Sequence, residues 1–363
     1  MKYLFINSVV GYGSTGKIVY KLCKDLTAEG NQCVAAWGRA CINSDDIDTY
    51  KIGNKFDLAV HLVKSRLFDS QGFESKRATR KFVKWVESYK PDIIWIHNIH
   101  GYYINLEILF EFIKKNNIKV IWTLHDCWAF TGHCAYFSYA KCNKWKNGCY
   151  ECISKKDYPK CYFRENSSRN YQRKKKAFTG VRDLKIVVPS KWLEELVKES
   201  YLNEYPVEVV YNRINNSVFQ PTQGDFRRKY GLENKKVLLG VANPWSPRKG
   251  LADFIELAET IGDEYRIVLV GVTEKQMKKL PSKIIGLKRT DSGKELAELY
   301  TMADLYLNLT YEDNYPTTNL EAQACGTPCI TYRTGGSIES VDSSNVVEQG
   351  NIEMLIEKIK ELC

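Results

Sequence analysis

Short apolar runs alternate with helical patterns along almost the whole chain, and this alternation limits the possible folds more than any other feature. The runs KYLFINSVV, PDIIWIHN and IKVIWTLHD predict buried strands in the first half, and NLEILFEFIKKNN predicts a helix between two of them. After the turn-rich stretch YNRINNSVFQPTQG, the alternation resumes with KKVLLGVAN, YRIVLVGV, SKIIGLKR, DLYLNLT and TPCITYR. Near-continuous apolar strands separated by helices are typical of parallel sheets covered on both faces.

The restart of the pattern predicts an α/β protein with two Rossmann-like domains, residues 1–210 and 211–363. With 363 residues the chain is long enough for two hydrophobic cores. No apolar run approaches the roughly 18 residues that a membrane-spanning helix needs, which argues against an integral membrane protein. The apolar N-terminus ends in a glycine turn without a small-residue cleavage site, so we expect a first strand rather than a signal peptide, and a cytoplasmic protein.

The chain is basic, with a formal net charge of +10, which favours an anionic partner such as a nucleotide, a nucleic acid or a membrane surface. Two stretches, SKRATRKFVKW (residues 75–85) and SSRNYQRKKKAF (residues 167–178), mix basic and aromatic residues on predicted helices. Such helices can lie on anionic lipid at the inner face of a membrane, or they can be solvated surface.

The glycine loop GYGSTGKI (residues 11–18) partly satisfies two phosphate-binding patterns. The dinucleotide pattern lacks its acidic partner, because the second strand ends in Trp37, Gly38 and Arg39. The P-loop pattern lacks its Mg²⁺-binding hydroxyl, because Ile18 stands in its place. What remains is a helix expected from about Thr15, whose N-terminus can face a phosphate; a tight turn without a ligand is the alternative.

The richest stretch of the C-terminal half is NLTYEDNYPTTNLEAQACGTPCITYRTGGSIES. Pro316 suits the first turn of a helix, whose free N–H groups at Thr317 and Thr318 predict an anion site. Asp313 lies on the loop before this helix and Glu321 about one turn inside it, and carboxylates suit sugar hydroxyls.

Upstream, NPWSPRKGLADFIEL places Arg248 and Lys249 at another strand-to-helix turn, where two cations can neutralise a diphosphate. Carboxylates for sugars together with cations for a diphosphate predict a nucleotide-sugar site. Surface charge and helix capping are the alternative explanation.

Residues 127–176 break the alternation and are rich in Cys, aromatic residues and Lys. Cys134, Cys142, Cys149 and Cys152 are the predicted ligands of a structural zinc ion, because Cys149 and Cys152 have the Cys-x-x-Cys spacing of half a tetrahedral site. Cys127, Cys161 and His133 are possible substitutes. Reduced cysteines that simply pack are the alternative, and a disulfide is the least expected outcome in the cytoplasm.

These motifs together resemble the glycosyltransferases of family 4, a retaining group with the GT-B fold of two Rossmann-like domains. The family has Glu, seven residues, Glu, followed by A-x-A-C-G-x-P; here Asp313 takes the first position, Glu321 the second, and EAQACGTPCI continues the motif. The P-R-K-G turn, the strand end TLHD and the N-terminal glycine loop match in order. The resemblance covers nearly the whole chain and is strongest to members that build bacterial surface polysaccharides such as O-antigen or capsule.

The resemblance implies a role for each matching residue. Glu321 is implied to hold the nucleotide ribose, and Lys249 and Gly16 the diphosphate. Asp313, with the backbone from Tyr315 to Thr317, is implied to hold the hexose, and His125 to face the reacting sugar. The chain departs from the family in two places: Asn243 and Pro244 stand where an Arg is usual, and Asp313 replaces Glu, which shortens that side chain by one methylene.

The implied reaction is hexosyl transfer, with retention, from a nucleotide sugar to a saccharide acceptor that is expected to be lipid-linked. Cations and helix N-termini would stabilise the departing diphosphate, so we expect no catalytic metal or other cofactor. His97 and His100 are weaker candidates for acceptor contacts. Two alternatives stay open: a GT-B-like sugar-nucleotide epimerase, and a zinc-containing nucleic-acid-binding protein, which would leave the residues from Asp313 to Glu321 without a role.

Overall fold

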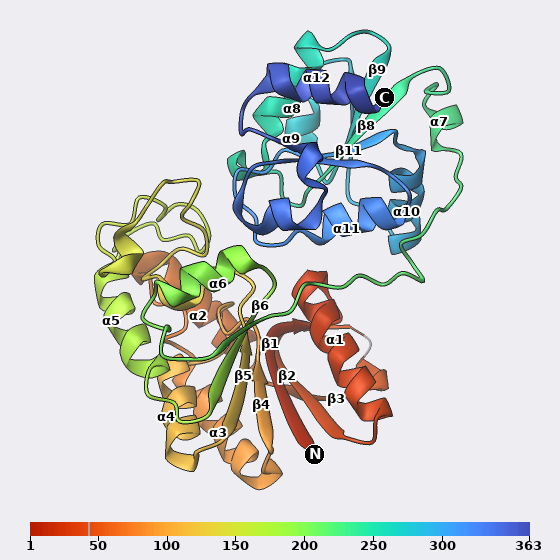
Figure 1. Ribbon diagram of the computed structural model, residues 1–363. Helices are drawn as coiled ribbons and strands as arrows, with labels where there is room; N and C mark the ends of the chain where they lie inside the picture. The colour runs from red at the N-terminus through yellow and green to blue at the C-terminus, as the bar shows by residue number, and fades with distance from the viewer. Residues whose placement is uncertain (43) are drawn as a thin grey trace. The chain divides into compact units, whose positions relative to one another are not determined.

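The computed structural model describes residues 1–42 and 44–363. The chain divides into two compact units, Met1–Val210 and Tyr211–Cys363, which we call the N-terminal and C-terminal units. Each unit is one parallel sheet with helices packed on it (Figure 1). This arrangement confirms the predicted pair of Rossmann-like domains. Among the described residues, no helix is both long enough and apolar enough to cross a bilayer.

The N-terminal sheet has seven strands in the order β3-β2-β1-β4-β5-β6-β7. The strands are β1 (Lys2–Val10), β2 (Gln32–Cys41), β3 (Asp48–Lys51), β4 (Ile93–Ile96), β5 (Lys119–Thr123), β6 (Leu184–Val188) and β7 (Val207–Val209). The helices are α1 (Gly13–Ala28), α2 (Lys55–Phe68), α3 (Lys76–Tyr89), α4 (Leu106–Asn116), α5 (Ser167–Phe178) and α6 (Lys191–Lys198), with 3₁₀ turns η1 (Ser44–Asp46), η2 (Trp128–Phe130) and η3 (Lys144–Lys146).

The alternating side chains of β1 show why both faces of this sheet are covered. Leu4 and Ile6 are buried in the larger core with Phe82 of α3, while Phe5 between them is buried on the other face with Val19 of α1. Because successive residues of a strand point to opposite faces, an uninterrupted apolar strand buries side chains in two cores.

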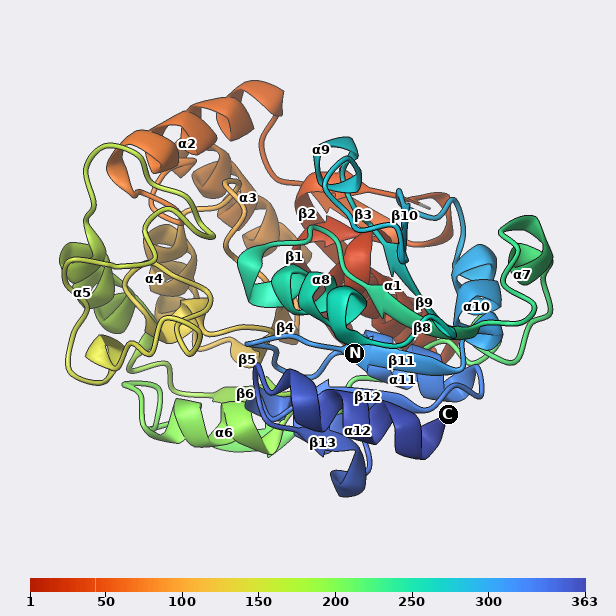
Figure 2. The ribbon, with the colours of Figure 1, turned by 90° about the horizontal axis from the view of Figure 1, so that it is seen from above.

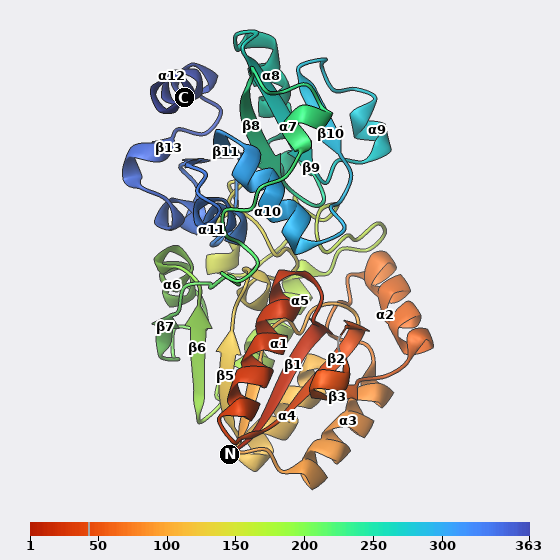
Figure 3. The ribbon, with the colours of Figure 1, turned by 90° about the vertical axis from the view of Figure 1, so that its right-hand side faces the viewer.

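The C-terminal sheet has six strands in the order β10-β9-β8-β11-β12-β13. The strands are β8 (Lys236–Val241), β9 (Tyr265–Val270), β10 (Ile284–Leu287), β11 (Leu305–Asn308), β12 (Cys329–Tyr332) and β13 (Val346–Val347). The helices are α7 (Phe226–Lys229), α8 (Leu251–Thr260), α9 (Glu274–Met277), α10 (Gly293–Met302), α11 (Thr317–Ala324) and α12 (Ile352–Leu362), with 3₁₀ turns η4 (Pro247–Lys249), η5 (Gly335–Ser340) and η6 (Ser343–Asn345). Figures 2 and 3 give two further views.

The segment at residues 127–176 ends in α5, which confirms the helix predicted over residues 167–178. The remainder packs around Trp145, which is buried and lies with its ring centroid 4.9 Å from Phe137 and 5.3 Å from Phe130. Lys174 of α5 is also buried, and its Nζ donates to the carbonyl oxygens of Trp128, at 2.7 Å, and Thr131, at 3.1 Å. An aromatic cluster and a buried lysine thus order a stretch that has few regular elements.

Candidate functional site

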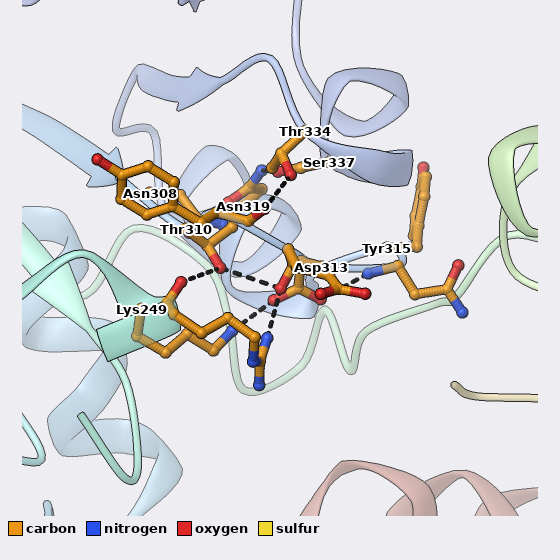
Figure 4. Close-up of polar contacts among 12 residues, drawn as sticks. Lys249, Asn308, Thr310, Asp313, Tyr315, Asn319, Thr334 and Ser337 are labelled. Atoms are coloured by element: carbon orange, nitrogen blue, oxygen red, sulfur yellow. Dashed lines mark hydrogen bonds and ion pairs between the residues drawn. The ribbon is translucent and has the colours of Figure 1, made fainter. Parts of the chain in front are cut away.

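Two loops meet at the carboxyl edge of the C-terminal sheet, where the strand order reverses between β8 and β11. The chain leaves β8 toward η4, which carries Arg248 and Lys249, and it leaves β11 toward α11. Ligands of open α/β sheets bind in the crevice at such a reversal. Figure 4 shows Lys249, Asp313 and Tyr315 at this edge. The structure therefore brings together the two cations and the carboxylate that the sequence separates by more than sixty residues.

Lys249 and Asp313 form an ion pair. Nζ of Lys249 donates to Oδ2 of Asp313 at 2.5 Å, and the two side chains are only 23% and 20% exposed. Arg248 holds the same two loops together, because its Nη1 donates to the carbonyl oxygen of Glu312. Its own carbonyl oxygen accepts from the backbone N–H of Tyr311 at 2.8 Å.

The surroundings of Asp313 favour its charged form. Burial raises the pKa of Asp313, but the positive charges of Lys249 and Arg248, with hydrogen bonds from Lys249 and the backbone N–H of Asn314, hold that pKa below its usual value. An ionised carboxylate only accepts hydrogen bonds. Asp313 can therefore take hydroxyl donors at neutral pH.

Gly250 explains why the Arg248–Lys249 turn can lie against the end of β11. Its φ of +74° lies in the left-handed region, and a Cβ on Gly250 would stand 2.0 Å from the carbonyl oxygen of Leu309. Glycine is the residue that tolerates both the backbone angle and the close approach. The turn that positions Lys249 thus depends on its neighbour having no side chain.

Helix α11 begins at Thr317, and Pro316 precedes it as the N-cap residue rather than lying in the first turn as predicted. The backbone of Pro316 is extended, with ψ of 120°, so the helix starts one residue later. Its N-terminus has no capping side chain in the part of the chain that the structure describes. The N–H groups of Thr317 and Thr318 belong to the first turn, where helices have unpaired donors and an anion is stabilised.

Glu321 lies one turn into α11 and is partly buried. Oη of Tyr300, a buried residue of α10, donates to its Oε2 at 3.1 Å. A carboxylate with two oxygens can accept this bond and still accept from a ligand. Sequence patterns did not indicate Tyr300, which is recognisable only as an apolar-face residue of its helix.

A buried polar network behind α11 was also missed. Asn319 is completely buried, and its Oδ1 accepts from Nδ2 of Asn308 at 2.7 Å, while its own Nδ2 donates to Oγ of Ser340 at 2.9 Å. Ser337 lies within 3.3 Å of the same Nδ2, and Figure 4 shows Asn308, Asn319 and Ser337 together. These bonds tie α11 to β11 and to η5. The sequence feature that could have indicated this network is Asn319 on the inward side of a short helix.

Gly16 lies in α1, which starts at Gly13 rather than at Thr15. Its carbonyl oxygen accepts from the N–H of Gly11 at 2.9 Å. A Cβ on Gly16 would stand 3.1 Å from Cγ2 of Val9, so glycine lets α1 pack tightly on the end of β1. This packing accounts for Gly16 without a ligand, and a diphosphate contact stays a prediction.

His125 follows β5 and lies against His97, which follows β4. Nδ1 of His97 and Nε2 of His125 are 2.9 Å apart, and the rings are stacked. Burial lowers the pKa of His125 to about 4 and that of His97 well below its usual range, and each ring is therefore neutral at neutral pH.

One proton lies between these two nitrogens, so one ring donates and the other accepts. Nε2 of His97 is buried without a partner among the described residues.

His100, the other acceptor-side candidate, is buried as well. Its Nδ1 lies 2.9 Å from Oη of Tyr158, and its Nε2 lies 3.0 Å from Oδ2 of Asp126. Both nitrogens thus contact side chains of the same unit. His97 and His100 support neighbouring groups, and their expected acceptor contacts stay untested.

Two of the four predicted zinc ligands, Cys134 and Cys152, contact each other. A hydrogen bond with Cys134 lowers the pKa of Cys152 to about 7, and Sγ of Cys149 accepts from the N–H of Gly132 at 3.1 Å. In residues 1–42 and 44–363, however, no group of three or more Cys, His, Asp or Glu side chains is arranged to hold a metal ion. The zinc ion stays a prediction, and so does the role of Cys142 as one of its ligands.

The two basic stretches of the sequence are α3 and α5, but their aromatic side chains point inward. Phe82 of α3 and Tyr171 and Phe178 of α5 are buried, and Trp85 stacks on Tyr50 with ring centroids 4.3 Å apart. These rings belong to the core because α3 and α5 pack on the sheet and on α4. Phe82, Tyr171 and Phe178 therefore do not belong to a lipid-facing surface. Contact of the basic side chains of α3 and α5 with anionic lipid stays a prediction.

Comparison with known proteins agrees with the fold and the motif. The family described as Glycosyltransferase Family 4 matches residues 15–218, and Glycosyl transferases group 1 matches residues 222–363. N-acetyl-alpha-D-glucosaminyl L-malate synthase of Bacillus anthracis is 30% identical over 163 residues, which cover 42% of this chain and 40% of that protein. The chain aligns with less than half the length of the curated relatives it matches.

Solved structures share the fold over the whole chain. Sucrose-phosphate synthase from Thermosynechococcus elongatus superposes with a TM-score of 0.69 at 15% identity, covering 99% of this chain and 89% of that one. HepE from Anabaena in complex with UDP-glucose gives 0.65 at 14% identity, with coverage of 99% and 89%. These neighbours confirm the GT-B fold. The match to the family model covers residues 15–218, more than half of the chain, and the chain therefore belongs to Glycosyltransferase Family 4.

Proposed function

We propose that the protein is a retaining hexosyltransferase that uses a nucleotide sugar and a lipid-linked saccharide acceptor in cell-surface polysaccharide synthesis, at the inner face of the plasma membrane. The observation that carries the proposal is the Lys249–Asp313 ion pair beside the N-terminus of α11. It places a cation, a carboxylate and helix N–H donors at one sheet edge, which are the groups that a sugar diphosphate needs.

Each residue of the C-terminal unit has a part in the proposed chemistry. Lys249 and Arg248, with the N–H groups of Thr317 and Thr318, neutralise the diphosphate. Asp313 and the backbone near Tyr315 bind the hexose. In the N-terminal unit, Gly16 and His125 keep the roles that the family resemblance implies, contact with the diphosphate and with the reacting sugar.

Glu321 accepts from the ribose hydroxyls, and the hydrogen bond from Tyr300 orients its carboxylate. One carboxylate oxygen can take each vicinal hydroxyl, which explains why an acidic residue rather than an amide suits this position.

The reaction breaks the bond between the anomeric carbon and the diphosphate oxygen and forms a bond to an acceptor hydroxyl oxygen on the same face. The acceptor proton passes to the departing phosphate. The anomeric carbon is oxocarbenium-like in the transition state, and the cations that bind the diphosphate stabilise the developing negative charge. This scheme uses the chain's own cations and helix dipole and needs no catalytic metal.

A thermal-shift panel of UDP, GDP, ADP and their hexose derivatives tests the donor site. We expect one base to stabilise the protein selectively, and Glu321→Ala to lose that shift. Absence of any shift would contradict the proposal. Product analysis then separates transfer from epimerisation, since a transferase yields a glycoside and an epimerase yields an altered nucleotide sugar.

A further inference from the structure

Helix α2 carries its apolar side chains on the outside. Phe56 is 75% exposed, Val63 is 54% exposed, and Val60 and Leu67 are exposed as well. Their spacing of four, three and four residues places them on one side of a helix with about 3.6 residues per turn. We call these four residues the α2 stripe. A soluble helix normally turns such a stripe toward the core.

The opposite side of α2 is held in place by polar contacts. His61 is completely buried, and its Nδ1 lies 2.8 Å from Oγ of Ser75 while its Nε2 accepts from the N–H of Gly72 at 3.1 Å. Ser65, one turn later, is buried too. Turning the stripe inward would bring these polar groups to the surface and break both bonds of His61, so its exposure is built into the packing.

A loop from elsewhere in the chain extends the stripe. The N–H of Tyr162 donates to the carbonyl oxygen of Arg66 at 2.7 Å, and the N–H of Arg164 donates to that of Leu67 at 2.8 Å. Phe163 between them is 75% exposed, and its ring meets Phe68 edge-on with centroids 6.2 Å apart. The loop thus caps the C-terminal carbonyls of α2 and adds exposed aromatic side chains beside the stripe.

Basic side chains flank this apolar surface. Lys55 and Lys64 lie on α2, Arg66 contacts Oη of Tyr162 at 3.2 Å, and Arg164 is exposed on the loop. Three acidic residues offset part of this charge: Glu74, which pairs with Lys64 at 3.0 Å, Asp57 of α2, and Glu165 next to Arg164. The excess is positive, in keeping with a chain of net charge +10.

We propose that the α2 stripe, together with Tyr162, Phe163 and Phe68, docks on the surface of an anionic lipid bilayer. Helices that lie in a membrane interface have this composition, with an apolar face that enters the headgroup region and basic residues that meet anionic lipids. A single large exposed apolar patch with a charged rim marks an interaction site. The inference rests on the proposed function and deepens it by naming the surface through which the enzyme reaches a lipid-borne acceptor.

Flotation of the full chain with vesicles tests the proposal. The vesicles contain phosphatidylcholine with one third phosphatidylglycerol, or phosphatidylcholine alone, and no donor or acceptor. The test variant is Phe56→Ser with Phe163→Ser, and the matched control is Met354→Ser, which removes an exposed apolar side chain (42% exposed) from α12. A second variant, Lys55→Glu with Arg164→Glu, probes the charges.

We expect the wild-type protein and Met354→Ser to bind the anionic vesicles, and Phe56→Ser/Phe163→Ser to bind about tenfold more weakly or worse. Lys55→Glu/Arg164→Glu should also bind the anionic vesicles more weakly than the wild-type protein, and added salt should weaken wild-type binding. Unchanged binding by the serine variant, or no wild-type binding, would overturn the proposal. A wild-type dimer in light scattering that the serine variant dissociates would instead assign the surface to a second copy.

The nucleotide thermal shift keeps this test separate from that of the proposed function. A serine variant that keeps the shift is folded and has its donor site, so its vesicle result reports on docking alone. A protein that binds vesicles but no nucleotide would contradict the proposed function and leave the docking surface in place.

Discussion

The ammonium group of Lys249 donates a hydrogen bond to the carboxylate of Asp313, although the two residues belong to different loops of the C-terminal unit. Their proposed partners differ, since Lys249 serves the diphosphate and Asp313 the hexose. A bound nucleotide sugar must therefore either share Lys249 with Asp313 or displace Asp313 from Lys249.

Opposite effects of two substitutions are the expected signature of this pair. Lys249→Ala should weaken binding of the preferred nucleoside diphosphate by roughly 10- to 100-fold, the value of a charge-assisted hydrogen bond. Asp313→Asn removes a competing anion, so affinity for the diphosphate should stay or rise, while kcat/KM for transfer falls by about 100-fold or more. Calorimetry measures the affinity for the diphosphate, and steady-state kinetics measure kcat/KM. Lys275→Ala, which changes an exposed lysine of α9, is the control; equal losses of affinity in both variants would contradict this account.

Glu321 should confer recognition of the ribose. The wild-type protein is expected to prefer a nucleoside diphosphate over its 2′,3′-dideoxy analogue by about tenfold, because each lost hydrogen bond to a charged acceptor weakens binding. Glu321→Gln should bind both forms with similar affinity, and Glu259→Gln on the exposed side of α8 should behave as wild type. Retained discrimination in Glu321→Gln would remove Glu321 from the ribose site.

Gly250→Ala should destabilise the C-terminal unit by several kcal/mol. The new Cβ meets the carbonyl oxygen of Leu309 at 2.0 Å on a backbone with φ of +74°. Gly231→Ala is a matched control, since Gly231 has φ of +62° but no atom within 4 Å of its would-be Cβ; it should cost only about 1 kcal/mol. Denaturation followed through Trp245, the single tryptophan of this unit's sequence, measures both. Equal costs would refute the steric explanation.

Acid should destabilise the N-terminal unit through its buried histidines. The folded pKa of His125 is about 4, below the ordinary 6.5, so the unfolded chain takes up a proton that the folded chain does not. Stability is full above about pH 6.5 and falls as the pH drops toward 4; at pH 5 the loss is about 2 kcal/mol for this residue. His61, with a pKa of about 3, adds to it. Urea denaturation at several pH values should give His125→Asn a shallower pH slope, and an unchanged slope would count against the assignment.

The zinc prediction can be settled by metal analysis. If Cys134, Cys142, Cys149 and Cys152 bind zinc as the sequence predicts, protein purified without chelator contains about one equivalent of zinc, because four thiolates make a closed tetrahedral site. Cys149→Ser with Cys152→Ser should lose the metal, and Cys363→Ser, at the other end of the chain, should keep it. Metal-free wild-type protein would leave the four residues as packing cysteines.

Local sequence patterns were enough to predict most of the fold. Alternating apolar residues such as Leu4, Phe5 and Ile6 predicted buried strands because a two-sided parallel sheet demands them. The loops that follow β8 and β11 were predicted as the nucleotide-sugar site because each carries a recognisable motif of neighbouring residues, Arg248–Lys249 in one and Asp313 to Glu321 in the other. The same reasoning could not show that Lys249 and Asp313 pair, since that contact depends on which strands become neighbours.

What the sequence determined by itself was the set of elements, the two domains and the charged residues of the candidate site. Only the tertiary structure decided which way certain side chains face. The aromatics of α3 and α5 are mixed with lysines and arginines in sequence, yet they lie in the core. The stripe of α2 has the spacing of a core-facing helix, yet the buried hydrogen bonds of His61 turn it to the surface. Periodicity reports that a helix has two faces, whereas contacts distant in sequence determine which face is buried.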